Sequence, residues 1–172
     1  LLNNYPILSY IILIFYIVGI TNSINFIDGL DGLAAGLSII ILTTFTLILT
    51  QSYLIKYLII LISILFGFLR SNTFPAKIFM GDSGSYFLGF TIAIFSLLLF
   101  LPDTNYNLSI IHPILVLIIP ILDTVRVILV RIKNKTSIFK PDRNHLHHYF
   151  IDKKIKHKNT VFLIYSLQAI IS

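Results

Sequence analysis

The sequence predicts an all-α fold, a polytopic bundle of transmembrane helices that forms one domain over residues 1–172. Of its residues 56% are hydrophobic and 12% are charged, and the mean hydropathy is +0.91. A soluble domain of this size leaves too much surface in water to hide that much apolar area. The apolar runs lack the alternation of half-buried strands, and helices satisfy their own backbone polar groups within lipid.

Six apolar runs approach the roughly 20 residues that a helix needs to cross a membrane. They are residues 6–20 or slightly beyond, 33–50, 54–69, 84–101, 113 to about 130 and a last run from 160 onward. The chain begins without Met or a basic leader and stops inside an apolar run, so we expect no signal peptide and a chain that is the C-terminal part of a longer protein. About six spans are therefore predicted, the last of them truncated.

Basic residues occur in alternate connections between these runs. Residues 131–159 hold nine Lys or Arg against two Asp, and 70–83 contain Arg70 and Lys77. The positive-inside bias therefore places 21–32, 70–83 and 131–159 on the cytoplasmic side. The net charge of +6 is explained by this basic loop beside apolar spans, so we expect no nucleic-acid partner. The absence of Cys excludes disulfides and thiolate metal sites.

The first polar connection contains carboxamides and carboxylates at intervals of three residues. They are Asn22, Asn25, Asp28 and Asp31. A helical turn would align them on one face, and their oxygens are hard ligands suited to Mg²⁺. The alternative is a Gly-rich turn in which the Asp-Gly pairs only punctuate helices. Asp beside lipid is costly, which favours a functional site.

The second connection presents Asp82 between Gly81 and Gly84, at the start of the next apolar run. Glycine allows a substrate to approach the backbone closely, and the free N–H groups at a helix start suit phosphate oxygens. Phe79 offers a flat face to a nucleobase. The alternative is that Asp82 or Ser83 only caps the following helix.

The third connection gathers basic and imidazole side chains. They are Arg143, His145, His147 and His148. Zinc usually needs four protein ligands and no matching cluster occurs elsewhere, so gripping phosphates is the better prediction. A solvated basic loop on anionic lipid is the alternative. In the fifth run, Asp123 and Arg126 either pair with each other or face the site.

Together the three connections resemble, in order and on one predicted side, the polyprenyl-phosphate N-acetylhexosamine-1-phosphate transferases of glycosyltransferase family 4. This family also includes the phospho-N-acetylmuramoyl-pentapeptide transferase. The resemblance implies transfer of N-acetylhexosamine-1-phosphate, with N-acetylglucosamine as the expected sugar, from a UDP-sugar to polyprenyl (undecaprenyl) phosphate, with release of UMP. It further implies Mg²⁺, with Mn²⁺ as the alternative cation, and an active site on the cytoplasmic face of the bacterial inner membrane. A homodimer is left open.

The resemblance also implies roles for individual residues. Asn25 and Asp82 match metal ligands, and Phe79 matches an aromatic that stacks on uracil. The residues implied in catalysis are Asp28, Asp31, Asp82, His145, His147 and His148, and those implied in substrate binding are Asn22, Phe79, Lys77 and Arg143. The muramoyl-pentapeptide branch usually has three consecutive His, whereas Leu146 interrupts them here, so the N-acetylglucosamine-phosphate branch is favoured.

One family feature, an Asp-Asp pair in an earlier cytoplasmic loop, has no match in this sequence. We expect that truncation explains this and that the chain alone carries an incomplete site. Three alternatives remain: a muramoyl-pentapeptide-type transferase, a transporter whose polar loops line a pathway, and a non-catalytic membrane scaffold.

Overall fold

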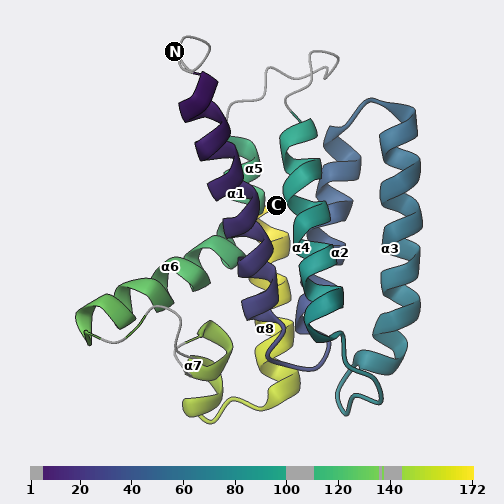
Figure 1. Ribbon diagram of the computed structural model, residues 1–172. Helices are drawn as coiled ribbons and strands as arrows, with labels where there is room; N and C mark the ends of the chain where they lie inside the picture. The colour runs from purple at the N-terminus through teal and green to yellow at the C-terminus, as the bar shows by residue number, and fades with distance from the viewer. Residues whose placement is uncertain (1–5, 100–110, 136, 138–144) are drawn as a thin grey trace.

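The structure is a computed structural model that describes residues 6–99, 111–135, 137 and 145–172 (Figure 1). These residues form eight helices and contain no strand, so the predicted all-α fold is confirmed for them. The helices are α1 (Pro6–Ile27), α2 (Leu33–Ile48), α3 (Ser52–Asn72), α4 (Gly81–Leu98), α5 (Ile111–Val116), α6 (Ile118–Lys133), α7 (Leu146–Asp152) and α8 (His157–Ile171).

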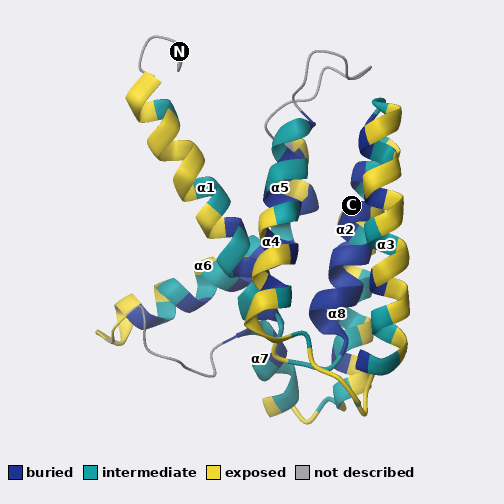
Figure 2. Cartoon of the chain, turned by 45° about the vertical axis from the view of Figure 1, so that its right-hand side comes forward, coloured by how far each residue is buried: buried dark blue, intermediate teal, exposed yellow. Residues whose placement is uncertain are grey.

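Two helices, α1 and α3, are long and apolar enough to cross a membrane. Most of their apolar side chains face outward, and Figure 2 shows exposed residues along both helices. Phe15 is 75% exposed and Tyr57 is 65% exposed. Large apolar surfaces of this kind are unfavourable in water and favourable in lipid. The chain is therefore a membrane protein, while the total of about six spans stays a prediction.

The core is centred on α2, whose side chains Leu37, Ile41 and Phe45 are fully buried. In Figure 1 the helices α1–α4 run side by side, with α3 at the outer edge. The contact between α1 and α4 is the most extensive. It depends on Gly89, because a Cβ there would lie 2.7 Å from the carbonyl oxygen of Thr21. This packing brings the end of α1 beside the start of α4.

The first helix is longer than predicted, because α1 continues to Ile27 through part of the expected loop 21–32. The side chains of Thr21, Asn22 and Ser23 donate hydrogen bonds to carbonyls four residues earlier. Their polar groups are thus satisfied within the helix, and polarity does not end it. Asn22 and Asn25 lie in the last turns of α1 rather than in a loop.

The predicted span 113–130 is interrupted, which corrects the expectation of one continuous helix. It is divided into α5 and α6 at Leu117, where φ is −100° and ψ is 12°. Pro120 has no N–H to offer the carbonyl of Val116. The buried Gln168 of α8 supplies the missing donor, with Nε2 2.7 Å from that carbonyl oxygen. Beyond the break, α6 leaves the bundle sideways (Figure 1).

The long basic connection 131–159 is also partly helical. It contains the end of α6, all of α7 and the start of α8, which begins at His157 rather than at 160. Figure 1 shows that α7 lies at the same end of the bundle as the α1–α2 and α3–α4 connections. The parts of the three motifs that the structure describes therefore share one end of the molecule.

Candidate functional site

A cavity of about 290 Å³, which we call the acidic cavity, lies between the α1–α2 turn and the start of α4. It is lined by Asp28, Gly29, Leu30, Asp31, Asn72, Phe79, Met80, Gly81 and Asp82. Two motifs separated by about 50 residues thus contribute acids to one space. Phe79 is 76% exposed, so its ring is open to a stacking partner.

Asn25 connects the two motifs. Its Nδ2 donates to Asp82 Oδ1 at 3.3 Å and to Ser85 Oγ at 2.8 Å. Ser85 is fully buried and donates in turn to the Gly81 carbonyl at 3.1 Å. The end of α1 and the first turn of α4 are therefore held together by side-chain hydrogen bonds, and the amide oxygen of Asn25 is the atom that could bind a metal. The sequence motifs did not single out the role of Ser85.

Asp28 faces an unfavourable electrostatic environment. Burial raises the pKa of its carboxyl to about 6, and the negative charge of Asp82 adds to the shift. Two neighbouring carboxylates repel each other, and a cation between them would remove this repulsion.

The donor set is compatible with Mg²⁺. Within the described residues, no group of three or more His, Cys, Asp or Glu could hold a metal ion. Mg²⁺ is commonly bound by one or two carboxylates together with water and substrate phosphates. Asp28, Asp82 and the amide of Asn25 therefore fit an ion that is shared with a phosphate ligand.

Asp31 is held by backbone and imidazole partners. Its Oδ2 accepts a hydrogen bond from the Ala76 N–H at 3.0 Å, and its own N–H donates to His157 Nε2 at 3.2 Å. The ring of His157 also stacks on Phe74, with centroids 4.5 Å apart. These contacts join the first two motifs to the start of α8. No sequence motif indicates a role for His157, because its partners lie far away along the chain.

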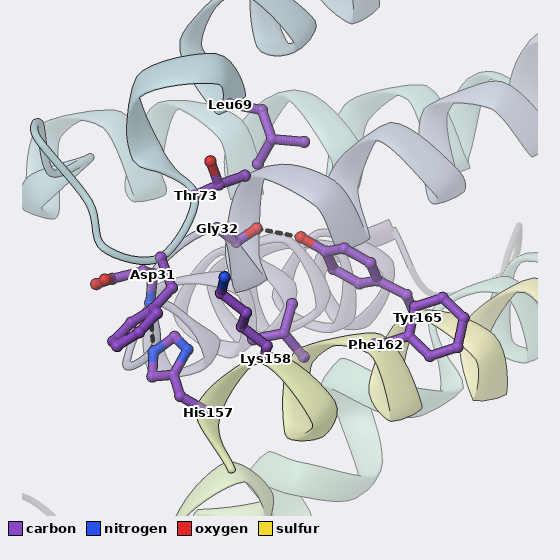
Figure 3. Close-up of a pocket in the computed structure, with 10 residues that line it drawn as sticks. Asp31, Gly32, Leu69, Thr73, His157, Lys158, Phe162 and Tyr165 are labelled. Atoms are coloured by element: carbon purple, nitrogen blue, oxygen red, sulfur yellow. Dashed lines mark hydrogen bonds between the residues drawn. The ribbon is translucent and has the colours of Figure 1, made fainter.

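Next to Asp31 the chain turns into α2 at Gly32, whose φ of +80° is the left-handed conformation that glycine favours. The Gly32 N–H donates to Asn72 Oδ1 at 3.1 Å, and Asn72 Nδ2 donates to the Ile78 carbonyl at 2.8 Å. Figure 3 shows the opposite side, where the Tyr165 hydroxyl donates to the Gly32 carbonyl at 2.5 Å. Figure 3 draws the lining of a second cavity, which has a volume of about 350 Å³. Asp31 lines both this cavity and the one beside Asp28 and Asp82, so it stands between two cavities.

The histidine motif is anchored to α6. Asp123 is 2% exposed, and its Oδ2 lies 2.8 Å from His145 Nδ1. Its Oδ1 accepts the Leu146 N–H at 2.5 Å, at the start of α7. Arg126 lies over the Tyr149 ring, 5.3 Å from the centroid. The carboxylate of Asp123 therefore contacts the residues at the start of α7.

His147 is the histidine that reaches the cavity edge. Its ring is stacked with that of His145 at 5.6 Å and lies 4.3 Å from that of His148. It also packs so closely on Gly29 that a Cβ there would meet its Cε1 at 2.5 Å. Burial lowers the pKa of His147 to about 4, and the neighbouring His148 contributes next. His147 is therefore neutral at physiological pH.

Two of the predicted substrate-binding residues lie elsewhere. Asn22 donates to the Val18 carbonyl within α1, and Lys77 is exposed; neither lines the acidic cavity. Arg143 lies outside the described residues.

The fold and site define an integral membrane protein with carboxylates, an open aromatic ring and histidines at one end of a helical bundle. Residues 1–100 match the family model described as glycosyl transferase family 4. The chain belongs to this family, which confirms the resemblance found in its sequence motifs.

Named relatives in this family include a probable undecaprenyl-phosphate N-acetylglucosaminyl 1-phosphate transferase of Bacillus subtilis, 44% identical over 96% of this chain and 47% of the relative. A phospho-N-acetylmuramoyl-pentapeptide-transferase of Clostridium acetobutylicum is 36% identical over 96% of this chain and 51% of the relative. A decaprenyl-phosphate N-acetylglucosaminephosphotransferase of Mycobacterium leprae is 36% identical over 90% of this chain and 44% of the relative. The chain spans about half the length of these curated relatives.

Proposed function

We propose that this chain carries much of the active site of a membrane transferase. The enzyme moves N-acetylglucosamine-1-phosphate from its UDP-sugar to undecaprenyl or another polyprenyl phosphate and releases UMP. The observation that carries the proposal is the single cavity lined by Asp28, Asp31 and Asp82 together with the open ring of Phe79. Acids for a metal–diphosphate complex and an aromatic platform for a base are the two parts that a nucleotide-sugar site needs.

The nucleotide would occupy this cavity with uracil on Phe79 and the diphosphate toward Asp82. Asp82 and Asn25 would hold Mg²⁺, or Mn²⁺ as the alternative, with Asp28 beside them. When bound, the ion neutralises charge on the diphosphate and on the leaving phosphate. Because His147 is neutral and packs at the cavity edge, it offers an N–H donor to a phosphate oxygen without adding a charge.

The reaction is a displacement at phosphorus. An oxygen of the lipid phosphate bonds to the β-phosphorus, the bond from that phosphorus to the bridging oxygen breaks, and UMP departs with the electron pair. A phosphate monoester is already ionised at neutral pH, so no side chain has to remove a proton before the attack. The residues of this chain act mainly by positioning and charge neutralisation, as is usual in phosphoryl transfer.

The acceptor lipid has an apolar groove available between α1 and α6. This groove has a volume of about 350 Å³ and is lined by Phe15, Tyr16, Gly19, Ile20, Ser23, Ile114, Ile121, Thr124 and Val125. Ser23 and Thr124 are joined by a hydrogen bond of 2.8 Å, and Ser23 precedes Asn25 by two residues. A prenyl chain in this groove would have its phosphate near the acidic cavity.

The remaining helices complete the proposed membrane domain. We place about six spans in the bacterial inner membrane, with the acidic cavity on the cytoplasmic side where UDP-sugars are found. The basic residues of 131–159 support this orientation. The missing acidic pair and the other parts of a complete site would come from the rest of the protein.

The test is UMP release from radiolabelled UDP-N-acetylglucosamine by the full-length protein in membranes supplied with polyprenyl phosphate. Asp82→Asn is expected to lower kcat by orders of magnitude, because it removes a charge facing the diphosphate. The matched control is Asp152→Asn, an exposed Asp at the end of α7. Near-normal turnover of Asp82→Asn at saturating Mg²⁺ would contradict the metal assignment.

The donor sugar is tested in the same assay. Transfer of phospho-N-acetylmuramoyl-pentapeptide is the second candidate activity, because a relative named for it is 36% identical to this chain. A kcat/KM higher for UDP-N-acetylmuramoyl-pentapeptide than for UDP-N-acetylglucosamine would select the second candidate. No UMP release with either donor would favour the transporter or scaffold alternatives.

A further inference from the structure

We propose that Asp123 is a positioning residue for this reaction, which fixes both the tautomer of His145 and the start of α7. The inference rests on the proposed function. Asp123 does not line the acidic cavity, and its carboxylate acts through the histidines that do approach it.

Both oxygens of Asp123 are engaged by consecutive residues. Oδ2 bonds His145 Nδ1 at 2.8 Å, and Oδ1 accepts the backbone N–H of Leu146. His145 is 8% exposed and Asp123 is 2% exposed, so both partners of the pair are buried. A buried carboxylate is costly unless its oxygens are bonded, and here His145 and the first residue of α7 provide the two bonds.

The chemistry of the pair determines the tautomer. A carboxylate only accepts hydrogen bonds, so Nδ1 of His145 must be the ring nitrogen that carries the proton. The other nitrogen, Nε2, is left with its lone pair when the ring is neutral. A hydrogen-bond acceptor on one ring nitrogen sets the tautomer and the ring orientation of histidines in many enzymes.

The position of His145 is passed on to the cavity by stacking. The His145 and His147 rings are nearly parallel, at 5°, and His147 packs on Gly29 of the cavity lining. On α6 itself, Asp123 is flanked by Ile121 and Thr124, which line the apolar groove. One helix therefore borders the proposed lipid groove and also orients the histidines.

The decisive experiment is a double-mutant cycle in the full-length enzyme with Asp123→Asn and His145→Gln. The asparagine keeps the shape and an acceptor for the Leu146 N–H, but its amide presents a donor toward His145. We expect kcat to fall about 10- to 100-fold while KM for UDP-N-acetylglucosamine changes less than about threefold. In the His145→Gln background, Asp123→Asn should lower kcat less than about threefold further, since its target is gone.

Two further variants separate positioning from folding. Asp152→Asn removes the same charge from an exposed site and should leave kcat and the unfolding temperature unchanged. Asp123→Glu keeps an acceptor for Nδ1 and should retain more than about a tenth of the wild-type kcat. If Asp123→Asn fails to fold, the cycle is run with Asp123→Glu, whose effect must likewise disappear in the His145→Gln background.

The tautomer is measured independently of activity by ¹⁵N NMR of the protein in bilayers, with His145 assigned by the signal that His145→Gln removes. A protonated Nδ1 is expected in the wild type and a protonated Nε2 in Asp123→Asn. A protonated Nε2 in the wild type, an unchanged kcat in Asp123→Asn, or equal losses in both backgrounds would overturn the inference. Absence of UMP release by the wild type, with Nδ1 protonated, would instead refute only the proposed function.

Discussion

Replacing Gly29 with alanine tests whether His147 must touch the α1–α2 turn for turnover. A Cβ at this position would lie 2.5 Å from His147 Cε1 and closer still to Nε2. Ordinary van der Waals contact begins at 3.4 Å, and the nearest ring atom, Nε2, would be only 2.3 Å away, so the ring must retreat by about 1.1 Å. The obstructed atoms are at the far end of a side chain, which lets the protein fold with the ring displaced. A misplacement of about 1 Å at a catalytic group can cost about 100-fold in rate, and we expect a loss of kcat of that order.

The assay is initial-rate UMP release by the full-length enzyme, together with its unfolding temperature. Overpacking of this kind costs about 1–3 kcal/mol, so the variant is expected to remain folded under assay conditions. The control is Gly67→Ala in α3, where a Cβ meets no atom within 4 Å and alanine favours a helix. If Gly29→Ala is folded and its kcat stays within threefold of the wild-type value, the contact between His147 and the turn is not needed.

Two other predictions concern stability. Gln168→Leu leaves the buried Val116 carbonyl without its side-chain donor, and we expect the free energy of unfolding to fall by about 1–3 kcal/mol in denaturant titrations; an unchanged value would contradict this account of the helix break. Burial is the main cause that lowers the pKa of His147 from 6.5 to about 4, and the neighbouring His148 is the next largest. Between these two pH values the unfolded chain binds a proton at His147 that the folded protein does not. The free energy of unfolding should therefore decrease as pH falls from about 6.5 to about 4, with no contribution above that range, and His147→Gln should flatten this slope.

The sequence predicted the elements whose formation depends on local pattern. Apolar runs located most of the helices, and the Asp, Phe and His motifs located residues that the structure brings to one end of the bundle. The sequence does not predict the end of α1, because polar residues after an apolar run favour a loop there. Thr21, Asn22 and Ser23 instead bond to their own helix, so a polar residue near a membrane interface does not by itself predict a loop.

The supporting residues could not be predicted, because their partners are distant in sequence. Asn72 and His157 bind the backbone around Asp31 from 40 and 126 residues away. Each is one polar residue at the end of an apolar helix, and many such residues only meet water. Only the fold shows that Asn72 satisfies the Gly32 N–H and that His157 accepts from Asp31.

The interruption between α5 and α6 shows why hydropathy alone gives the wrong shape for the fifth apolar run. A continuous helix would keep Asp123 within an apolar span, where an unpaired carboxylate is costly. Pro120 removes the one N–H that would bond the Val116 carbonyl, and the Gln168 side chain donates to that carbonyl instead. The redirected α6 then places Asp123 against His145 and Leu146, which satisfy both carboxylate oxygens. In this apolar run, Pro120 and Asp123 therefore indicate the broken helix that the hydropathy of the run does not.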